Sequence, residues 1–129
     1  MSNYKFPKEF KLASKSDFKA VFDYKLFARN DLMTVYMSPN GLEMRRFAVS
    51  ISAKAAPAVL RNRLKRIARE AFRLSQYDLP ASFDYLIIYS RLLSKRQNFD
   101  IKAIGLAQVR QGFTELAARA YKRYEARQK

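Results

Sequence analysis

The side chains with the clearest chemical potential are the cations of a basic segment, residues 59–73. The segment contains no Gly or Pro and is rich in good helix formers, so the sequence predicts one helix that starts at Pro57 and ends near Ser75. A solvated helix face would mix both signs of charge, but Glu70 is the only acid between Lys54 and Arg73, against seven Lys and Arg. At about 100° per residue, cations and apolar residues fall on opposite sides, which predicts a surface for a polyanion. The predicted RNA-binding residues of this basic helix are Arg61, Asn62, Arg63, Lys65, Arg66, Arg69 and Arg73, and its apolar stripe is Leu60, Leu64, Ile67, Ala71 and Leu74.

Residues for catalysis are missing from the same sequence. The chain has no His and no Cys, which removes the commonest general base and all thiol and zinc chemistry. Its three Gly residues form no phosphate-cradling loop, and no local pair of acids suggests a two-metal site. We therefore predict no catalytic residue, no resident metal and no bound cofactor, so that any chemistry lies in a partner.

A second candidate site involves aromatic side chains near the basic helix. Residues 32–38 and 46–52 alternate as strands do, with one apolar and one small or polar side, on which Tyr36 is the only large residue. Single-stranded nucleic acid binds to basic grooves with aromatic stacking platforms, and Tyr36 is the best candidate for one. The alternative is that Tyr36 packs under a helix, and for Phe18 and Phe22, at i and i+4, a core position is favoured by spacing alone. Lys54 either is solvated or closes a groove between this side of the strands and the basic helix, and Asn62 either is solvated or bonds a base edge or phosphate.

Length and charge limit the class of protein. The chain of 129 residues is long enough for one domain with a core, and its 49% hydrophobic content excludes a disordered tail. A formal charge of +15 indicates an anionic partner, with nucleic acid the first candidate and an acidic membrane surface the second. A membrane is disfavoured because the core needs the apolar stripe and because the chain lacks Trp. The start lacks a signal-peptide pattern and the longest apolar run, 85–89, is too short to span a bilayer, so we expect a cytoplasmic protein.

The predicted elements form a small α+β fold. After a flexible basic arm over about 1–13, we expect a helix from Ser14 or Ser16 to about Tyr24. Two strands, 32–38 and 46–52, should then form a hairpin through the turn Pro39-Asn40-Gly41. The basic helix is followed by a strand over 84–90, a basic loop over 91–99 and a helix over about 100–126 with a frayed end at about 125–129. A short extra strand is expected within 26–31. This α-β-β-(β)-α-β-α order predicts a two-layer sandwich, with a mixed sheet of about four strands and helices packed on one side. The pattern leaves the strand pairing open.

Four segments in order resemble the bacterial ribonuclease P protein subunit. Arg61-Asn62-Arg63 and the residues to Arg73 look like the family's Arg-Asn-Arg signature. Residues 15–22 resemble its first helix, 47–54 the strand before the signature and 84–88 the strand after it. The resemblance covers about residues 8–90 in register and the terminal helix in kind. It implies a compact domain with a left-handed βαβ crossover through the signature helix.

The resemblance also implies a function. In that family a catalytic RNA, using Mg²⁺, removes the 5′ leader from precursor tRNA, and the protein binds that RNA and the single-stranded leader. One RNA and one protein are then expected, without membrane or DNA. By matching position, the leader cleft would consist of Phe18, Phe22, Tyr36, Ser50, Ser52 and Lys54, and Lys54, Arg61, Asn62, Lys65 and Arg69 would lie at its border or on the RNA-facing surface.

Three departures from the family pattern are evident. Ala53-Lys54 stands where two Lys are usual, Ala55-Ala56-Pro57 lacks the usual Gly, and the segment 90–103 is longer and lacks a Pro. Family contacts at these places are not carried over. The alternative function is a ribosome-associated structural or chaperone-like RNA binder, whose affinity for precursor tRNA would not depend on leader length.

Overall fold

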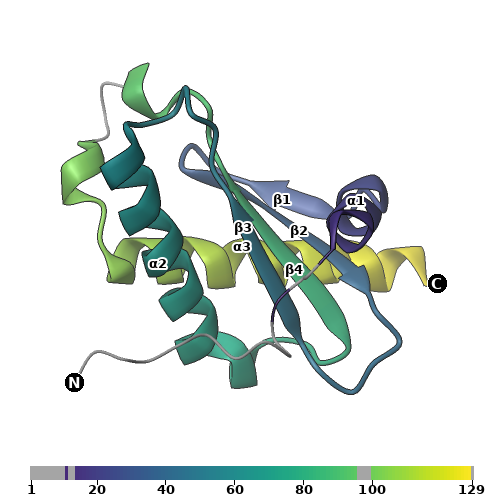
Figure 1. Ribbon diagram of the computed structural model, residues 1–129. Coiled ribbons are helices and arrows are strands. Elements are labelled where there is room, and N and C mark those ends of the chain that lie inside the picture. Colours follow the sequence, from purple (N-terminus) through teal and green to yellow (C-terminus); the bar gives the residue numbers. More distant parts are fainter. Residues whose placement is uncertain (1–10, 12–13, 96–99, 129) are drawn as a thin grey trace.

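A computed structural model describes residue 11 and residues 14–95 and 100–128 (Figure 1). The elements follow the predicted order, with the extra short strand present. They are α1 (Lys15–Asp23), β1 (Phe27–Arg29), β2 (Met33–Pro39), β3 (Arg46–Ser50), α2 (Ala58–Ser75), β4 (Phe83–Tyr89) and α3 (Leu106–Arg127), with short 3₁₀ turns at Gln76–Asp78, Leu93–Lys95 and Ile101–Ala103. The predicted N-terminal arm lies, except for Lys11, outside the described residues.

Two helix starts follow local capping rules. The Ser14 side chain accepts a hydrogen bond from the Asp17 amide at 3.1 Å, which confirms Ser14 as the cap of α1. The last helix starts at Leu106 rather than near Asp100, because Asp100 caps a separate 3₁₀ turn by accepting from the Lys102 amide at 3.1 Å. At its other end α3 reaches Arg127, whose guanidinium donates to the Lys25 carbonyl at 2.7 Å. Fraying of 125–129 stays a prediction.

The sheet has the strand order β1-β2-β4-β3. β2 pairs antiparallel with both β1 and β4, whereas β3 pairs parallel with β4. The predicted hairpin between 32–38 and 46–52 is therefore wrong, because β4 lies between these two strands. β4 is apolar on both faces, and burying both faces favours the central position that it occupies. The parallel pair β3 and β4 is joined through α2, as the resemblance implied, and the left hand of that crossover stays an expectation.

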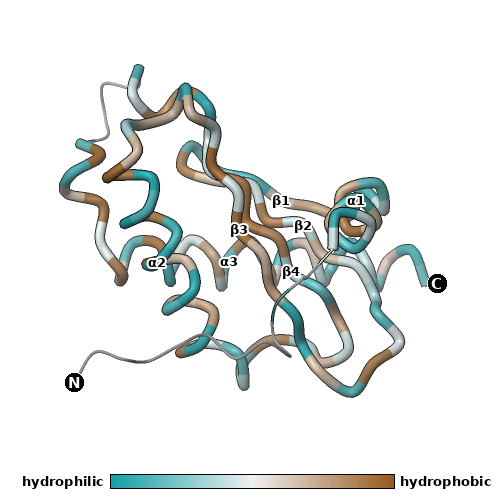
Figure 2. The backbone as a smooth tube through the Cα atoms, viewed as in Figure 1, coloured by the Kyte–Doolittle hydropathy of each residue, from teal (hydrophilic) through white to brown (hydrophobic). Residues whose placement is uncertain are grey.

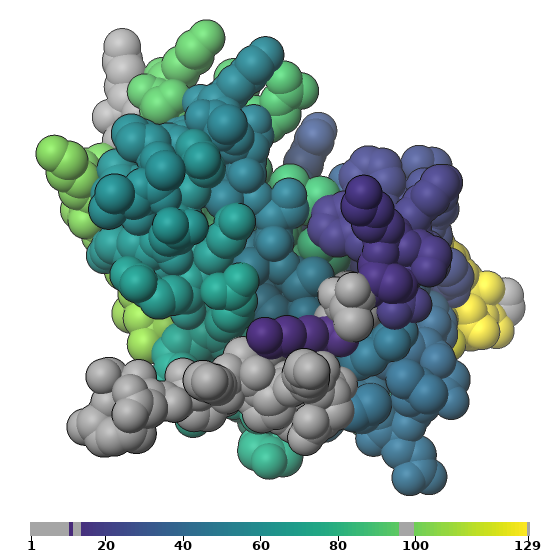
Figure 3. Space-filling model, viewed as in Figure 1, coloured from purple at the N-terminus to yellow at the C-terminus, as the bar shows by residue number. Residues whose placement is uncertain are grey.

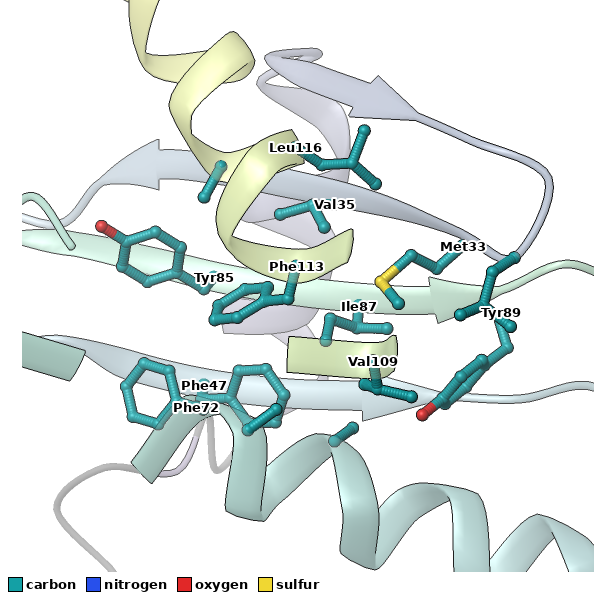
Figure 4. Close-up of a cluster of buried hydrophobic side chains, with 14 of the residues drawn as sticks. Met33, Val35, Phe47, Phe72, Tyr85, Ile87, Tyr89, Val109, Phe113 and Leu116 are labelled. Carbon is teal, nitrogen blue, oxygen red and sulfur yellow. The ribbon is translucent and has the colours of Figure 1, made fainter. Parts of the chain in front are cut away.

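The core lies between one face of the sheet and the helices α2 and α3 (Figures 2 and 4). Alternate residues of each strand point to it, as the two-residue period of a strand requires. The Phe47 ring of β3 stacks on Phe72 of α2 at 4.8 Å between centroids, and Phe113 of α3 meets Phe47 edge-on at 6.0 Å. We call this side of the sheet the core face. Its fully or almost fully buried side chains include Met33, Val35, Met37, Phe47, Tyr85 and Ile87, covered by Leu64, Phe72, Val109, Phe113 and Leu116.

The opposite side of the sheet, the second face, is covered in part by α1. In Figure 1, α3 runs behind the sheet and α1 lies in front of it. The prediction that the helices pack on one side is correct for α2 and α3 but wrong for α1. The position of Leu86 explains the difference. Leu86 pairs with Tyr36 on the second face and is fully buried. An apolar side chain there must be covered, and α1 covers it by packing on β2 and β4. The four-stranded mixed sheet with three helices confirms the α+β class.

Candidate nucleic-acid interface

Three aromatic rings gather on the second face beside α1. Tyr36 of β2 lies 5.0 Å, centroid to centroid, from Phe22 of α1 and 5.3 Å from Phe27 of β1. We call Phe22, Phe27 and Tyr36 the aromatic triad. Phe22 is 39% exposed, and the other two rings are half-buried, so each offers an accessible surface together with a packed one. Tyr36 thus packs against α1, as one of the two alternatives held, while part of its ring remains open to solvent; its use as a stacking platform stays a prediction.

Phe18 and Phe27 complete the aromatic side of the site. Phe18 lies one helical turn before Phe22 and is half-buried, so neither Phe18 nor Phe22 is a core residue. Phe27 was absent from the predicted site. It belongs to a strand of three residues, too short for a clear alternation, and its place follows from pairing with Tyr36 in register.

A charged cluster ties α1 to the sheet next to the triad. The Arg46 guanidinium of β3 donates to both carboxylate oxygens of Asp84 of β4, each at 2.8 Å, and also contacts Asp17 of α1 at 3.4 Å. Asn40 donates to Asp84 as well, at 2.9 Å. Hydrogen bonding to Asp84 raises the pKa of Arg46 above its usual value, so the guanidinium stays charged. This cluster holds one wall of the site in place.

Small polar side chains continue the second face away from α1. Ser50 is the last residue of β3 and is half-buried, on the same face as Arg46 and Ala48. Ser52 is also half-buried, and its hydroxyl accepts from the Lys54 amide at 3.1 Å. Lys54 is exposed and lines a hollow of about 860 Å³ that it shares with Thr34 of β2. In Figure 3, the atoms of α1 (purple) and α2 (teal) stand on either side of a recessed strip of the sheet.

The basic helix α2 borders this strip. Phe72 stacks on Phe47 of the edge strand β3, and at about 100° per residue Lys65 lies almost in line with Phe72 two turns earlier. Lys65 and Arg69 therefore lie along the side of α2 that adjoins β3, both half-buried. Asn62 and Arg66 are exposed.

Three cations of α2 are bonded within the protein or partly buried. One nitrogen of Arg61 donates to the Ala56 carbonyl at 2.9 Å, and Arg73 forms a two-point ion pair with Glu70. Arg63 lies on the side of α2 away from Phe72, and its Nη1 atom is buried with no hydrogen-bond partner among the described residues. Arg66, Arg69 and Lys65 thus present the charge of α2 that is most available to a partner.

The buried stripe of α2 is rotated relative to the predicted one. Leu64 and Ala71 are buried as expected, but Leu74 is 37% exposed, and Ala68, Phe72 and Ser75 are buried instead. The cause is α3, which covers a second side of α2: the Arg110 guanidinium donates to the Ser75 hydroxyl at 2.9 Å and to the Leu74 carbonyl at 3.2 Å.

Other kinds of site are not apparent in the described part of the chain. No three acidic side chains come together there as metal ligands would. No described helix is both long and apolar enough to cross a bilayer.

Fold and surface together define a small, strongly basic α+β protein that presents accessible aromatic rings beside a cationic helix. A family model described as Ribonuclease P matches residues 6–117. The "Ribonuclease P protein component" of Photobacterium profundum is 34% identical over 104 residues, 78% of this chain and 86% of that one. That of Caldanaerobacter subterraneus subsp. tengcongensis is 35% identical over 78 residues, 60% of this chain and 67% of that one.

Solved structures agree with these matches. The RNase P protein from Thermotoga maritima superposes with a TM-score of 0.73 at 28% identity, covering 84% of this chain and 96% of that one. The Staphylococcus aureus RNase P protein shares the fold, with a TM-score of 0.70 at 21% identity. The chain belongs to the ribonuclease P protein family. It is thus an RNA-binding subunit of an endoribonuclease of tRNA processing, with an RNA subunit and tRNA as partners, as the resemblance implied.

Proposed function

We propose that the second face binds the single-stranded 5′ leader of precursor tRNA, while the exposed side of α2 binds the catalytic RNA. The observation that carries this proposal is the aromatic triad, which leads onto Ser50, Ser52 and Lys54 along a strip bordered by α1 and α2. Half-exposed rings can stack on bases of any identity, which suits leaders of varied sequence. The triad and the outer side of α2, with Asn62 and Arg66, face different partners in this arrangement.

The proposed assignment gives each residue a role. Phe18, Phe22, Phe27 and Tyr36 supply stacking surfaces, and Ser50, Ser52 and Lys54 bond to the leader backbone. Lys65 and Arg69 border the leader, whereas Asn62 and Arg66 meet the catalytic RNA. Arg61, Arg63 and Arg73 have a smaller share, since Arg61 and Arg73 already bond within the protein and Arg63 is partly buried.

The proposed complex contains one protein and one catalytic RNA. We place it in the cytoplasm because its RNA partners are found there, and not because of any feature of the chain. Magnesium belongs to the RNA in this proposal. No catalytic step is assigned to the protein.

A cleavage assay tests the proposal. Catalytic RNA cleaving precursor tRNA is measured across a Mg²⁺ series with and without the protein. The protein is expected to lower the Mg²⁺ requirement, and to cleave nothing alone. Cleavage by the protein alone, or an unchanged Mg²⁺ requirement, would contradict the proposal.

Leader length separates this function from the alternative of a structural or chaperone-like RNA binder. Affinity of the complex for precursor tRNA is expected to rise as the leader grows to a few nucleotides. The alternative predicts no change.

The role of α2 has its own test. Arg66→Ala and Arg69→Ala are expected to weaken binding to RNA with a shallower log–log salt dependence, by about 0.7–0.9 for each lost phosphate contact. Arg119→Ala, an exposed cation on α3, is the matched control.

A further inference from the structure

The end of α3 lies beyond the part of the chain that the family model matches. The match ends at residue 117, whereas α3 continues to Arg127. We call residues 118–127 the helix extension. In Figures 1 and 3, the yellow end of α3 reaches the side of the molecule where α1 lies. The side chains of the helix extension therefore act on a different part of the sheet from those of α2.

Two tyrosines fix the rotation of the helix extension against the sheet. The Tyr121 ring meets Phe83 of β4 edge-on at 5.8 Å between centroids, and Tyr124 meets the same ring at 5.0 Å. Positions i and i+4 share one side of a helix, so Arg123 and Arg127 lie together. While the tyrosines rest on Phe83, that side of the helix adjoins β1, on which α3 packs.

Arg123 bonds to the free edge of the sheet. β1 is an edge strand, and Leu26 and Asn30 make their main-chain hydrogen bonds to β2. In an antiparallel pair such residues alternate with residues whose main-chain groups point away from the partner strand, so the Phe27 carbonyl lies on the open side of β1. The Arg123 guanidinium donates to this carbonyl. A carbonyl that β2 cannot reach is thereby paired, and Phe27 is held from the edge of the sheet.

Arg127 holds the corner between α1 and β1. Its guanidinium donates to the Lys25 carbonyl at 2.7 Å and lies over the Tyr24 ring, 5.8 Å from the ring centroid. Lys25 has φ 58°, a left-handed conformation that residues other than glycine adopt infrequently. A corner in this conformation persists only when its surroundings hold it, and Arg127 supplies a hydrogen bond and a ring contact there.

The corner connects two members of the aromatic triad. It joins Phe22, near the end of α1, to Phe27, the first residue of β1. The rings of Phe22 and Phe27 lie 5.0 and 5.3 Å from Tyr36. A shift of the corner would therefore change both distances at once.

We propose that Arg123 and Arg127 are positioning residues, which hold Phe22 and Phe27 at the spacing from Tyr36 that a stacked base requires. They act through the triad and touch no nucleotide of the leader. The inference rests on the proposed function, in which the triad binds the leader. The helix extension then contributes to substrate binding from outside the interface and from outside the family match.

Leader-dependent binding is the first test. Arg123→Ala and Arg127→Ala are introduced together in the full chain, which is reconstituted with catalytic RNA, and affinity is measured for precursor tRNA with a leader and for leaderless tRNA. The double variant should bind the substrate with a leader roughly threefold to tenfold more weakly, as expected for lost hydrogen bonds at an exposed site, and leaderless tRNA equally well. Arg123→Lys with Arg127→Lys keeps two donors and should restore part of the affinity.

A double-mutant cycle with Tyr36→Ala is the second test. If the arginines act through the triad, removing them from a protein that already lacks the Tyr36 ring should cause little further loss of affinity. The log–log salt slope of the arginine variant should equal that of the control below, whereas direct phosphate contacts would make it shallower by about 0.7 each.

The free protein provides a third test, which needs no RNA. Nuclear Overhauser effects between the ring protons of Tyr36 and those of Phe22 and Phe27 report the spacing of the triad. They should weaken when Arg123 and Arg127 are replaced by Ala.

A matched control removes the same charge from the same helix extension. Arg119→Ala with Lys122→Ala changes two exposed side chains on the outer side of the helix. This variant should bind both substrates as the unaltered protein does and should keep the ring Overhauser effects. Thermal unfolding of all variants verifies the fold.

Four results would overturn the inference. They are equal affinity of the arginine variant and the unaltered complex, an equal loss for both substrates, losses that add to that of Tyr36→Ala, or unchanged ring Overhauser effects. If Tyr36→Ala weakens leader binding and the arginine variant does not, only the inference fails. If the unaltered complex binds both substrates equally, the proposed function fails, and the ring Overhauser effects still decide whether the arginines hold the triad.

Discussion

The two faces of the sheet are built from the same four strands and differ in almost every physical respect. On the core face, Met33, Val35 and Met37 of β2 are buried, and α3 packs against this strand. Figure 4 shows Met33 and Val35 beside α3. On the second face, Thr34 and Tyr36 of the same strand remain half-exposed. A strand sends alternate residues to opposite sides, so one run of seven residues has both a packed side and a side open to solvent. Stability and binding should therefore respond to different substitutions along one strand.

The second face is itself divided. Near α1 it is sealed over Leu86 and stabilised by the Arg46–Asp84 pair, and toward the hollow it is open and cationic. The closed part positions the triad, and the open part leaves room for a ligand. Four predictions, from the largest expected effect to the smallest, test how far the two faces are separate.

The largest effect is expected from the core face. Phe113→Ala removes a fully buried ring that meets Phe47, Phe72 and Tyr85, and should lower the free energy of unfolding by about 3–5 kcal/mol. Urea denaturation measures the change. Arg119→Ala, exposed on the same helix, should stay within about 0.5 kcal/mol. Equal losses in both variants would show that the core face does not carry the stability.

Breaking the charged cluster should also destabilise, although it lies on the second face. Arg46→Met leaves the Asp84 carboxylate, 5% exposed, with Asn40 but without its cation, a loss of about 3 kcal/mol. Asp17→Asn removes only the longer contact, at a side chain 37% exposed, and should cost less than about 1 kcal/mol. Denaturant titration of both variants shows whether the Arg46–Asp84 pair, which joins β3 to β4, contributes more to stability than the Arg46–Asp17 contact, which orients α1.

Tyr36→Ala should affect binding rather than the core. The complex is expected to lose about 1–3 kcal/mol of affinity for precursor tRNA with a leader, the value of one stacked base, and nothing for leaderless tRNA. Tyr36→Phe keeps the ring and should retain most of the affinity. A uniform loss for both substrates would mean that the ring supports the fold instead of the leader.

Alkaline pH should distinguish buried from exposed tyrosines. Burial on the core face raises the pKa of Tyr89, whose hydroxyl donates to the Leu64 carbonyl at 2.8 Å, well above the ordinary value of about 10. The pKa of Tyr89 is therefore higher in the folded than in the unfolded protein. For this reason the contribution of the buried Tyr89 to the free energy of unfolding is complete below about pH 10 and declines as the pH rises further, by about 1.4 kcal/mol per pH unit. Tyr89→Phe should make the decline between pH 10 and 11 shallower, and Tyr77→Phe, 84% exposed, should not. Unfolding titrations across pH 8–11 measure both slopes, and identical slopes would contradict the prediction.

Local sequence patterns predicted most of the elements because the physical signal is local. The cap at Ser14, the amphipathic α2 and the alternation of β2 each depend on residues within a few positions of one another. Leu64 was predicted as core and is fully buried, and Tyr36 was predicted on the polar side of its strand and lies there.

The errors concern pairs of elements far apart in sequence. The turn signal at Pro39-Asn40-Gly41 is real, with Gly41 at φ 69°, but a turn does not decide which strand lies alongside. Phe27 joins the triad only through its partner in β2, and Arg29 and Arg91 share a hollow only once β1 and β4 flank β2. The continuous apolar run of β4 indicated that helices pack on both faces of the sheet, because a strand that is buried on two sides must be covered on two sides.

The central position of β4 also sets an order of events during synthesis. β2 and β3 leave the ribosome first and share no hydrogen bonds, so the four-stranded sheet cannot close until residue 89 has emerged. Until then the nascent chain contains at most α1, the β1–β2 pair, a β3 without its partner strand and the basic helix α2. Contacts between distant residues slow folding, and exposed strand edges favour aggregation. The nascent protein thus passes through a cationic, incompletely folded stage that ends only when β4 joins β2 and β3.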